Sequence, residues 1–132
     1  MAALIPSHLD LCEKQALAYL ATPLPADAMC VNPVWCDYDG THILLNAAQG
    51  RLQDRMMRRN PAVPLCVADP DNPSRYLEIR DHVVAMTTDS AEAHVDRLAH
   101  KYLGQETDPF RQPGEVRVLY RLAPDTVVPF AA

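Results

Sequence analysis

Six short apolar runs, separated by segments rich in proline, glycine, aspartate and asparagine, limit what this chain can fold into. Runs of this length that end in turn-forming residues favour β-strands over helices. The last run alternates apolar and charged side chains, which is typical of a strand with one face toward solvent. The predicted strands cover residues 16–22, 29–36, 42–46, 62–68, 75–86 and 115–123.

Two turn segments predict how these strands are connected. Asp39-Gly40 lies between apolar runs and signals a tight hairpin, so we expect the first three strands to form a meander. Residues 69–74, DPDNPS, cannot continue a strand ladder and predict a second hairpin between 62–68 and 75–86. Pro33 predicts an edge position or a bulge, because proline has no backbone N–H to donate.

Helical patterns occur in three places: residues 7–15, 50–59 and 88–104. In the last of these, apolar residues recur at helical spacing and Gly104 follows the final one, as at a helix C-terminus. Six strands with three short helices predict a mainly β (α+β) fold. We expect a small, largely antiparallel barrel, because closure removes exposed strand edges, and a single domain over residues 1–132.

Composition excludes several classes of function. The chain has 132 residues, a formal net charge of -5 and no apolar run long enough to span a membrane. The N-terminal residues do not resemble a signal peptide, so we expect a cytoplasmic protein that does not bind membranes. Lys14 and Lys101 are the only lysines, which argues against a nucleic-acid surface.

Cysteine and histidine spacing predicts neither a metal site nor a nucleophile. The five histidines lack the spacing of a metal site, and no Ser-His-Asp arrangement has local support. No C-x-x-C pair occurs, so we interpret the cysteines as buried, reduced packing residues. These residues are Cys12, Cys30, Cys36 and Cys66.

An arginine cluster is the strongest candidate for a binding site. Arg51, Arg55, Arg58 and Arg59 fall within nine positions of this acidic chain. Arg51 lies in the first turn of the predicted helix, where the helix dipole disfavours a cation. A phosphate at the helix start, held by Arg51, Arg55 and the N–H groups of the preceding AAQG loop, would explain that position. The alternative is a solvated helix face on which Asp54 and nearby acids neutralise the arginines.

Six segments, taken together, resemble one protein family from about residue 5 to residue 130. They are VNPVW, LLNAAQGR, RRNP, DPDNPSRYLEIR, HVDRLAHKYLG and PFRQPGEVRVLYRL. In this order they resemble the actinobacterial pyridoxamine phosphate oxidase-like, deazaflavin-dependent oxidoreductases. The resemblance implies an FMN-binding-like fold, a six-stranded antiparallel split β-barrel with short helices. It also implies a homodimer with two cofactor sites at the subunit interface, each binding coenzyme F420 or, in some relatives, FMN.

The resemblance also implies which residues bind the cofactor. The strand around Asn32, Pro33, Val34 and Trp35 would form a wall beside the redox ring. Arg51 and Arg55 would be phosphate ligands within a segment that holds the phosphate. The implied residues of that segment are Asn46, Ala47, Ala48, Gln49, Gly50, Arg51, Gln53 and Arg55. No catalytic side chain is implied, because in such enzymes the cofactor carries the chemistry.

Two positions depart from the family pattern. Gln53 stands where many relatives have lysine, and Met56 stands where they have asparagine. Losing a charge-assisted contact removes about 1.5–3 kcal/mol of binding free energy. The expected function is hydride transfer between reduced F420 and a small organic substrate, an enone or similar activated double bond. The alternatives are an FMN-binding oxidase or reductase of the same fold, and a non-redox barrel that binds an anionic small molecule.

Overall fold

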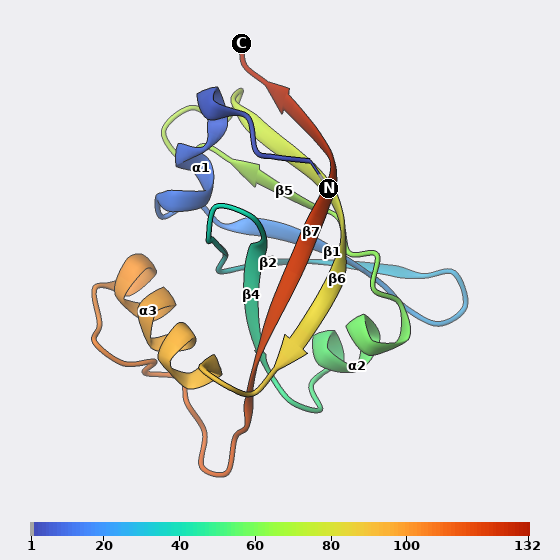
Figure 1. Cartoon of the computed structure of the whole chain (residues 1–132), viewed down its shortest axis with the longest axis vertical. Helices are drawn as coiled ribbons and strands as arrows, with labels where there is room; N and C mark the ends of the chain where they lie inside the picture. The colour runs from blue at the N-terminus through green and yellow to red at the C-terminus, as the bar shows by residue number, and fades with distance from the viewer. Residues whose placement is uncertain (1) are drawn as a thin grey trace.

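The computed structural model describes residues 2–132, so residue 1 of the predicted domain range lies outside the described residues. The fold is mainly β, one antiparallel sheet with short helices beside it (Figure 1). The helical elements are η1 (Pro6–His8), α1 (Asp10–Glu13), α2 (Leu52–Arg59) and α3 (Ala91–Leu103). The strands are β1 (Ala18–Pro23), β2 (Met29–Val34), β3 (Asp37–Tyr38), β4 (Ile43–Ala48), β5 (Leu65–Ala68), β6 (Tyr76–Thr87) and β7 (Arg117–Phe130).

All six predicted strands are present, but the described chain has seven strands, so the predicted number is wrong. The additional strand is β3, which pairs with β4. It forms because the Asp39 carboxylate accepts the N–H groups of Thr41 and His42 at 2.8 and 2.7 Å, which tightens the Asp39-Gly40 turn. This turn joins β3 to β4, so the hairpin signal was correct and the strand before it was misassigned.

The predicted meander of the first three strands is also wrong. The strand order is β2-β1-β5-β6-β7-β4-β3, so β4 pairs with β7 rather than with β2. Over residues 2–132, β2 and β3 are the two ends of this order and the sheet is not closed, which leaves the predicted barrel unconfirmed. Pro33 lies in β2, at the edge of the sheet, as its missing N–H predicted.

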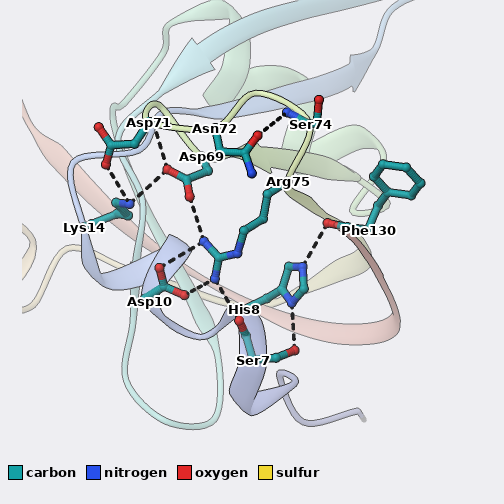
Figure 2. A network of polar contacts seen from close by, with 10 residues as sticks. All are labelled: Ser7, His8, Asp10, Lys14, Asp69, Asp71, Asn72, Ser74, Arg75 and Phe130. Atoms are coloured by element: carbon teal, nitrogen blue, oxygen red, sulfur yellow. Dashed lines mark hydrogen bonds and ion pairs between the residues drawn. The ribbon is translucent and has the colours of Figure 1, made fainter. Parts of the chain in front are cut away.

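The second predicted hairpin is confirmed, since β5 pairs with β6. Its turn is fixed to α1 by an ion-pair network (Figure 2). Asp69 accepts Lys14 Nζ at 3.0 Å and Arg75 Nη1 at 2.9 Å, and Arg75 also pairs with Asp10. The Asp71 N–H and these cations lower the pKa of Asp69 to about 2. The acidic residues of the turn are therefore used to hold the N-terminal segment.

The main core is formed by the buried residues of β1, β4, β5, β6 and β7, together with Leu11 and Cys12 of α1 and Met57 of α2. In the view of Figure 1, α3 and α2 flank strands β4 and β7 from the left and the right. Helix α2 contributes Met56 and Met57 to the core, whereas Leu52 at its first position is 44% exposed. The predicted helix over 7–15 is divided into η1 and the one-turn α1. No helix among residues 2–132 is both long and apolar enough to cross a membrane.

Asp81 on β6 is a buried acid, 4% exposed, with no cation paired to it in the described part of the chain. Burial and the neighbouring Asp125 carboxylate raise its pKa to about 8, although the Val63 N–H opposes them. The folded protein therefore retains a proton between pH 3.8 and about 8 that the unfolded chain releases. Its stability contribution is complete below the unfolded pKa and is lost as the pH rises toward 8.

We expect D81N to raise the urea midpoint of unfolding much more at about pH 8.5 than at about pH 5, because the amide needs no proton to stay neutral. D89N, which removes an exposed carboxylate, is the matched control and should show no such difference. An equal effect of D81N at both pH values would contradict the assignment.

Candidate functional site

A cavity of about 300 Å³ lies where the end of β2, strand β4, helix α3 and the segment before β7 meet. Among the predicted site residues, those that line it are Pro33, Val34, Trp35, Asn46 and Arg51. Sequence reasoning did not find the other lining residues, which are Leu17, Val95, Leu98, Asp108, Phe110 and Arg117. The cavity thus joins the predicted ring wall to one end of the predicted phosphate segment.

One wall of the cavity is aromatic. Trp35 is half-buried and stacks on Tyr102 of α3, with ring centroids 5.5 Å apart and planes inclined by 6°. Phe110, 65% exposed, lies against Trp35 at 6.4 Å. Pro33 and Val34 extend this wall along the free edge of β2. A flat, apolar ligand surface would match it, because aromatic side chains stack on such surfaces.

The opposite end of the cavity is polar, and its two arginines are paired with one glutamate. Arg51 Nη2 lies 3.3 Å from Glu115 Oε1, and the same oxygen accepts Arg117 Nη1 at 2.6 Å. Burial opposes ionisation of Glu115, yet the Gln112 N–H and Arg117 hold its pKa below the usual value. The Arg51 side chain is 59% exposed, whereas that of Arg117 is only 9% exposed. Arg51 is therefore the cation that a ligand can reach.

Asn46 is engaged by the protein itself. Its Nδ2 donates to Ala91 O at 2.8 Å and lies 3.1 Å from His94 Nδ1, and its Oδ1 accepts Arg117 Nε at 2.8 Å. Burial and the charge of Arg97 lower the pKa of His94 to about 4, so the imidazole is neutral near pH 7. Asn46 thus positions Arg117 against helix α3 and has little capacity left for a ligand.

The start of α2 differs from the prediction. The loop N–H groups expected to bind a phosphate are already used: Gln49 donates to Val116 O at 2.8 Å, Gly50 to Asp54 Oδ2 at 2.9 Å and Arg51 to Ala48 O at 3.2 Å. The donors that remain are those of the first helical residues, Leu52 to Asp54, because such residues lack an acceptor within the helix. An anion at Arg51 would meet these groups instead of the loop.

The arginine cluster divides into two parts. Arg58 Nε donates to both oxygens of Asp54 at 3.1 and 3.2 Å, as the neutralised-face alternative predicted. Arg51 lines the cavity and pairs with Glu115, while its binding of an anion stays a prediction. Arg55 and Arg59 are exposed and do not line the cavity. Acidic residues thus pair with both Arg51 and Arg58, and within the cluster only Arg51 lines the cavity.

The remaining predicted site residues do not line the cavity. Ala47 and Ala48 are both buried, at 9% and 3% exposure. Asn32, Gln49, Gly50 and Arg55 are exposed, and Gln53 is half-buried. Met56, one of the two departures from the family pattern, is on the buried side of α2 and is 6% exposed. Its replacement of asparagine therefore does not alter the cavity wall.

The sequence contained a signal for Glu115 and Arg117 that was not used. Both lie on the wetter face of the last predicted strand, two residues apart and thus on the same side. Their proximity to Arg51 depends on the pairing of β7 with β4, which places Arg117 opposite Ala48. Within residues 2–132, no group of three or more His, Cys, Asp or Glu side chains is arranged to hold a metal ion.

No protein-family model and no curated protein sequence matches the chain. Among solved structures, an F420 reductase superposes with a TM-score of 0.82 at 29% identity, covering 95% of this chain and 98% of its own. A conserved protein from Mycobacterium tuberculosis gives 0.73 at 18% identity, covering 97% and 86%. A candidate pyridoxamine 5'-phosphate oxidase from Listeria innocua gives 0.69 at 17% identity, covering 93% and 94%.

The second and third of these structures show the fold alone, because their identities are low. The first is similar over nearly the full length of both chains. The chain therefore shares the pyridoxamine phosphate oxidase-like fold and is similar to an F420 reductase, which confirms the family resemblance that its sequence motifs indicated.

Proposed function

We propose that this chain is an oxidoreductase that uses coenzyme F420 to transfer a hydride to a small organic substrate, an enone or a similar activated double bond. One observation carries the proposal: the apolar wall of Pro33, Val34 and Trp35 shares a cavity with the exposed cation Arg51. The likeness to an F420 reductase supports it. When bound, the deazaflavin supplies the hydride chemistry, so the protein needs to bind, orient and exclude water.

The residues present fit such a cofactor. Trp35 is held by its stack on Tyr102 and would lie against the ring, while Pro33 and Val34 would keep water from it. Arg51 would hold a phosphate together with the N–H groups of Leu52 and Gln53 at the start of α2. Arg117, fixed by Glu115, would add positive charge behind Arg51. Gln53, in place of a lysine, keeps an amide donor but no charge.

FMN is the second candidate, because the chain shares its fold with a candidate pyridoxamine 5'-phosphate oxidase. A flavin with one phosphate presents the same two features as F420, a flat ring and an anion. The apolar wall and Arg51 would therefore hold either group. The titration below distinguishes them.

We also propose that the single domain acts as a homodimer, in which the open seven-stranded sheet of each copy forms a split β-barrel. The face of β1 and β2 that carries Tyr19, Met29 and Val31 is apolar and exposed, at 46%, 54% and 62%. The strand register places Val31 opposite Ala21 and Met29 opposite Pro23 on this face. A contiguous apolar face of this kind marks an interaction surface, and a second copy of the chain would cover it.

We expect F420 to bind the wild type and R51A to weaken that binding by about one to two powers of ten, as for the loss of one charge-assisted hydrogen bond. Fluorescence and absorbance titrations with F420 and, separately, with FMN measure it. R59A is the matched control, because Arg59 is exposed on the same helix and does not line the cavity.

If R51A and R59A weaken binding equally, the assignment of Arg51 is wrong. Failure of the wild type to bind either cofactor would contradict the proposed function. Binding of F420 without reduction of any enone by the reduced coenzyme would support the non-redox binding protein instead.

For the homodimer, we expect V31D to convert the wild-type dimer into a monomer in light-scattering measurements after gel filtration, because a buried unpaired carboxylate opposes association. L103D places the same charge at an exposed apolar position at the end of α3 and should remain dimeric. A monomeric wild type, or a dimeric V31D, would contradict this interface.

A further inference from the structure

Two cysteines that are distant in the sequence lie together in the core. Cys12, in α1, and Cys36, between β2 and β3, are both 0% exposed and both free. The ammonium group of Lys101 contacts the main-chain carbonyls of both residues, which places the two cysteines side by side. Cys30 and Cys66, by contrast, are half-buried. The burial predicted for Cys12 and Cys36 is confirmed, but their pairing was not predicted.

The last turn of α3 holds the two cysteine segments against each other. Lys101 Nζ donates to Cys12 O and to Cys36 O, each at 2.7 Å, so one ammonium group bridges both main chains. The Tyr102 hydroxyl accepts the Cys36 N–H at 3.2 Å, donates to Ala16 O at 2.7 Å and lies 3.7 Å from Cys36 Sγ. Hydrogen bonds from Lys101 and Tyr102 therefore hold the main chains of both cysteines inside the apolar core.

The surroundings make the two thiols unequal. The Cys12 thiol, Lys101 and the Tyr102 hydroxyl lower the pKa of Cys36, although burial opposes them. The neighbouring Cys36 thiol, together with burial, raises the pKa of Cys12. Cys36 is therefore the better nucleophile, because the thiolate is the reactive form, and Cys12 is placed to react second.

We propose that Cys12 and Cys36 form a redox-active dithiol that a small hydroperoxide converts into an intramolecular disulfide. A cavity of about 600 Å³ lies between α1, β3 and α3, and Glu13, Asp37 and Lys101 line it. Glu13 and Asp37 are the chain neighbours of the two cysteines, which do not themselves line the cavity. The one-turn helix α1 packs against β3, so its opening would connect Cys36 as well as Cys12 to this cavity, because such short elements unfold locally at low free energy.

The reaction is balanced with hydrogen peroxide as the oxidant. The Cys36 thiolate attacks one peroxide oxygen, so a sulfur–oxygen bond forms, the oxygen–oxygen bond breaks and hydroxide leaves with a proton as water. Cys12 sulfur then attacks Cys36 sulfur, which forms the disulfide and breaks the sulfur–oxygen bond. The Cys12 proton goes to the leaving hydroxide. Two thiols and one peroxide give one disulfide and two waters.

Oxidation of this pair would alter the position of Trp35 in the wall of the first cavity. Trp35 precedes Cys36 in the chain and stacks on Tyr102, whose hydroxyl contacts Cys36. Drawing the two sulfurs together to bonding distance, about 2.05 Å, would shift this contact. Trp35 is the sole tryptophan of the chain, so its fluorescence reports on the site directly.

The test uses the full chain with C30S and C66S, which leaves only the proposed pair. After treatment of the native protein with hydrogen peroxide, we expect an intact mass lower by about 2 Da, the loss of two hydrogen atoms. Peptide mapping should give a Cys12–Cys36 crosslink, Trp35 fluorescence should change, and dithiothreitol should reverse both. An unchanged mass in the native protein, under conditions that oxidise the same protein in guanidinium, would overturn the proposal.

Single replacements in that background test the order of reaction. With C12S, we expect dimedone to trap a sulfenic acid at Cys36 at least about tenfold faster than it traps Cys12 with C36S, because Cys36 has more thiolate character. Equal labelling would overturn the assignment of Cys36 as the attacking thiol. Circular dichroism of each variant, with C12A as a second replacement, confirms that the compared proteins are folded. Neither measurement depends on cofactor binding.

Discussion

The buried carboxylate of Asp54 determines where helix α2 begins, and the geometry of the candidate site depends on it. At 2% exposure it accepts the N–H of Gly50, both contacts of Arg58 Nε and the hydroxyl of the fully buried Tyr120. Burial opposes its ionisation, yet these donors keep its pKa below the usual value. Because the carboxylate binds Gly50 from within the helix, the chain turns there, and Arg51 follows at the cavity.

The cavity brings together segments from both ends of the strand order. Strand β2 contributes Pro33 and Val34 to the apolar wall, while β4 and β7 contribute the polar residues Asn46 and Arg117. Three strands lie between β2 and β7 in the sheet, and four lie between β2 and β4. Glu115 links Arg51 to Arg117, so the cation available to a ligand is held in place by a buried counter-charge. An anionic ligand at Arg51 would have to compete with this carboxylate for the guanidinium, so Arg117 behind it is needed to offset the charge of Glu115.

The last turn of helix α3 contacts both the first cavity and the cysteine pair. Tyr102 supports Trp35 at the first cavity with its ring and contacts Cys36 with its hydroxyl, while Lys101 bridges the two cysteine segments. The dithiol and the cavity wall are therefore mechanically connected through a single side chain. This connection gives the chain a means by which the thiol redox state could affect a ligand near Trp35.

Local pattern determined the strand runs, helix α3, the turn at Asp39-Gly40 and the edge position of Pro33, because each depends on side-chain period or backbone chemistry within a few residues. Tertiary structure decided that β4 pairs with β7, that Asp54 captures the Gly50 N–H, and that Glu115 and Arg117 meet Arg51. It also brought the main chains of Cys12 and Cys36 together at Lys101. These contacts join residues far apart in the chain, and their free energies depend on packing and burial that no local pattern encodes.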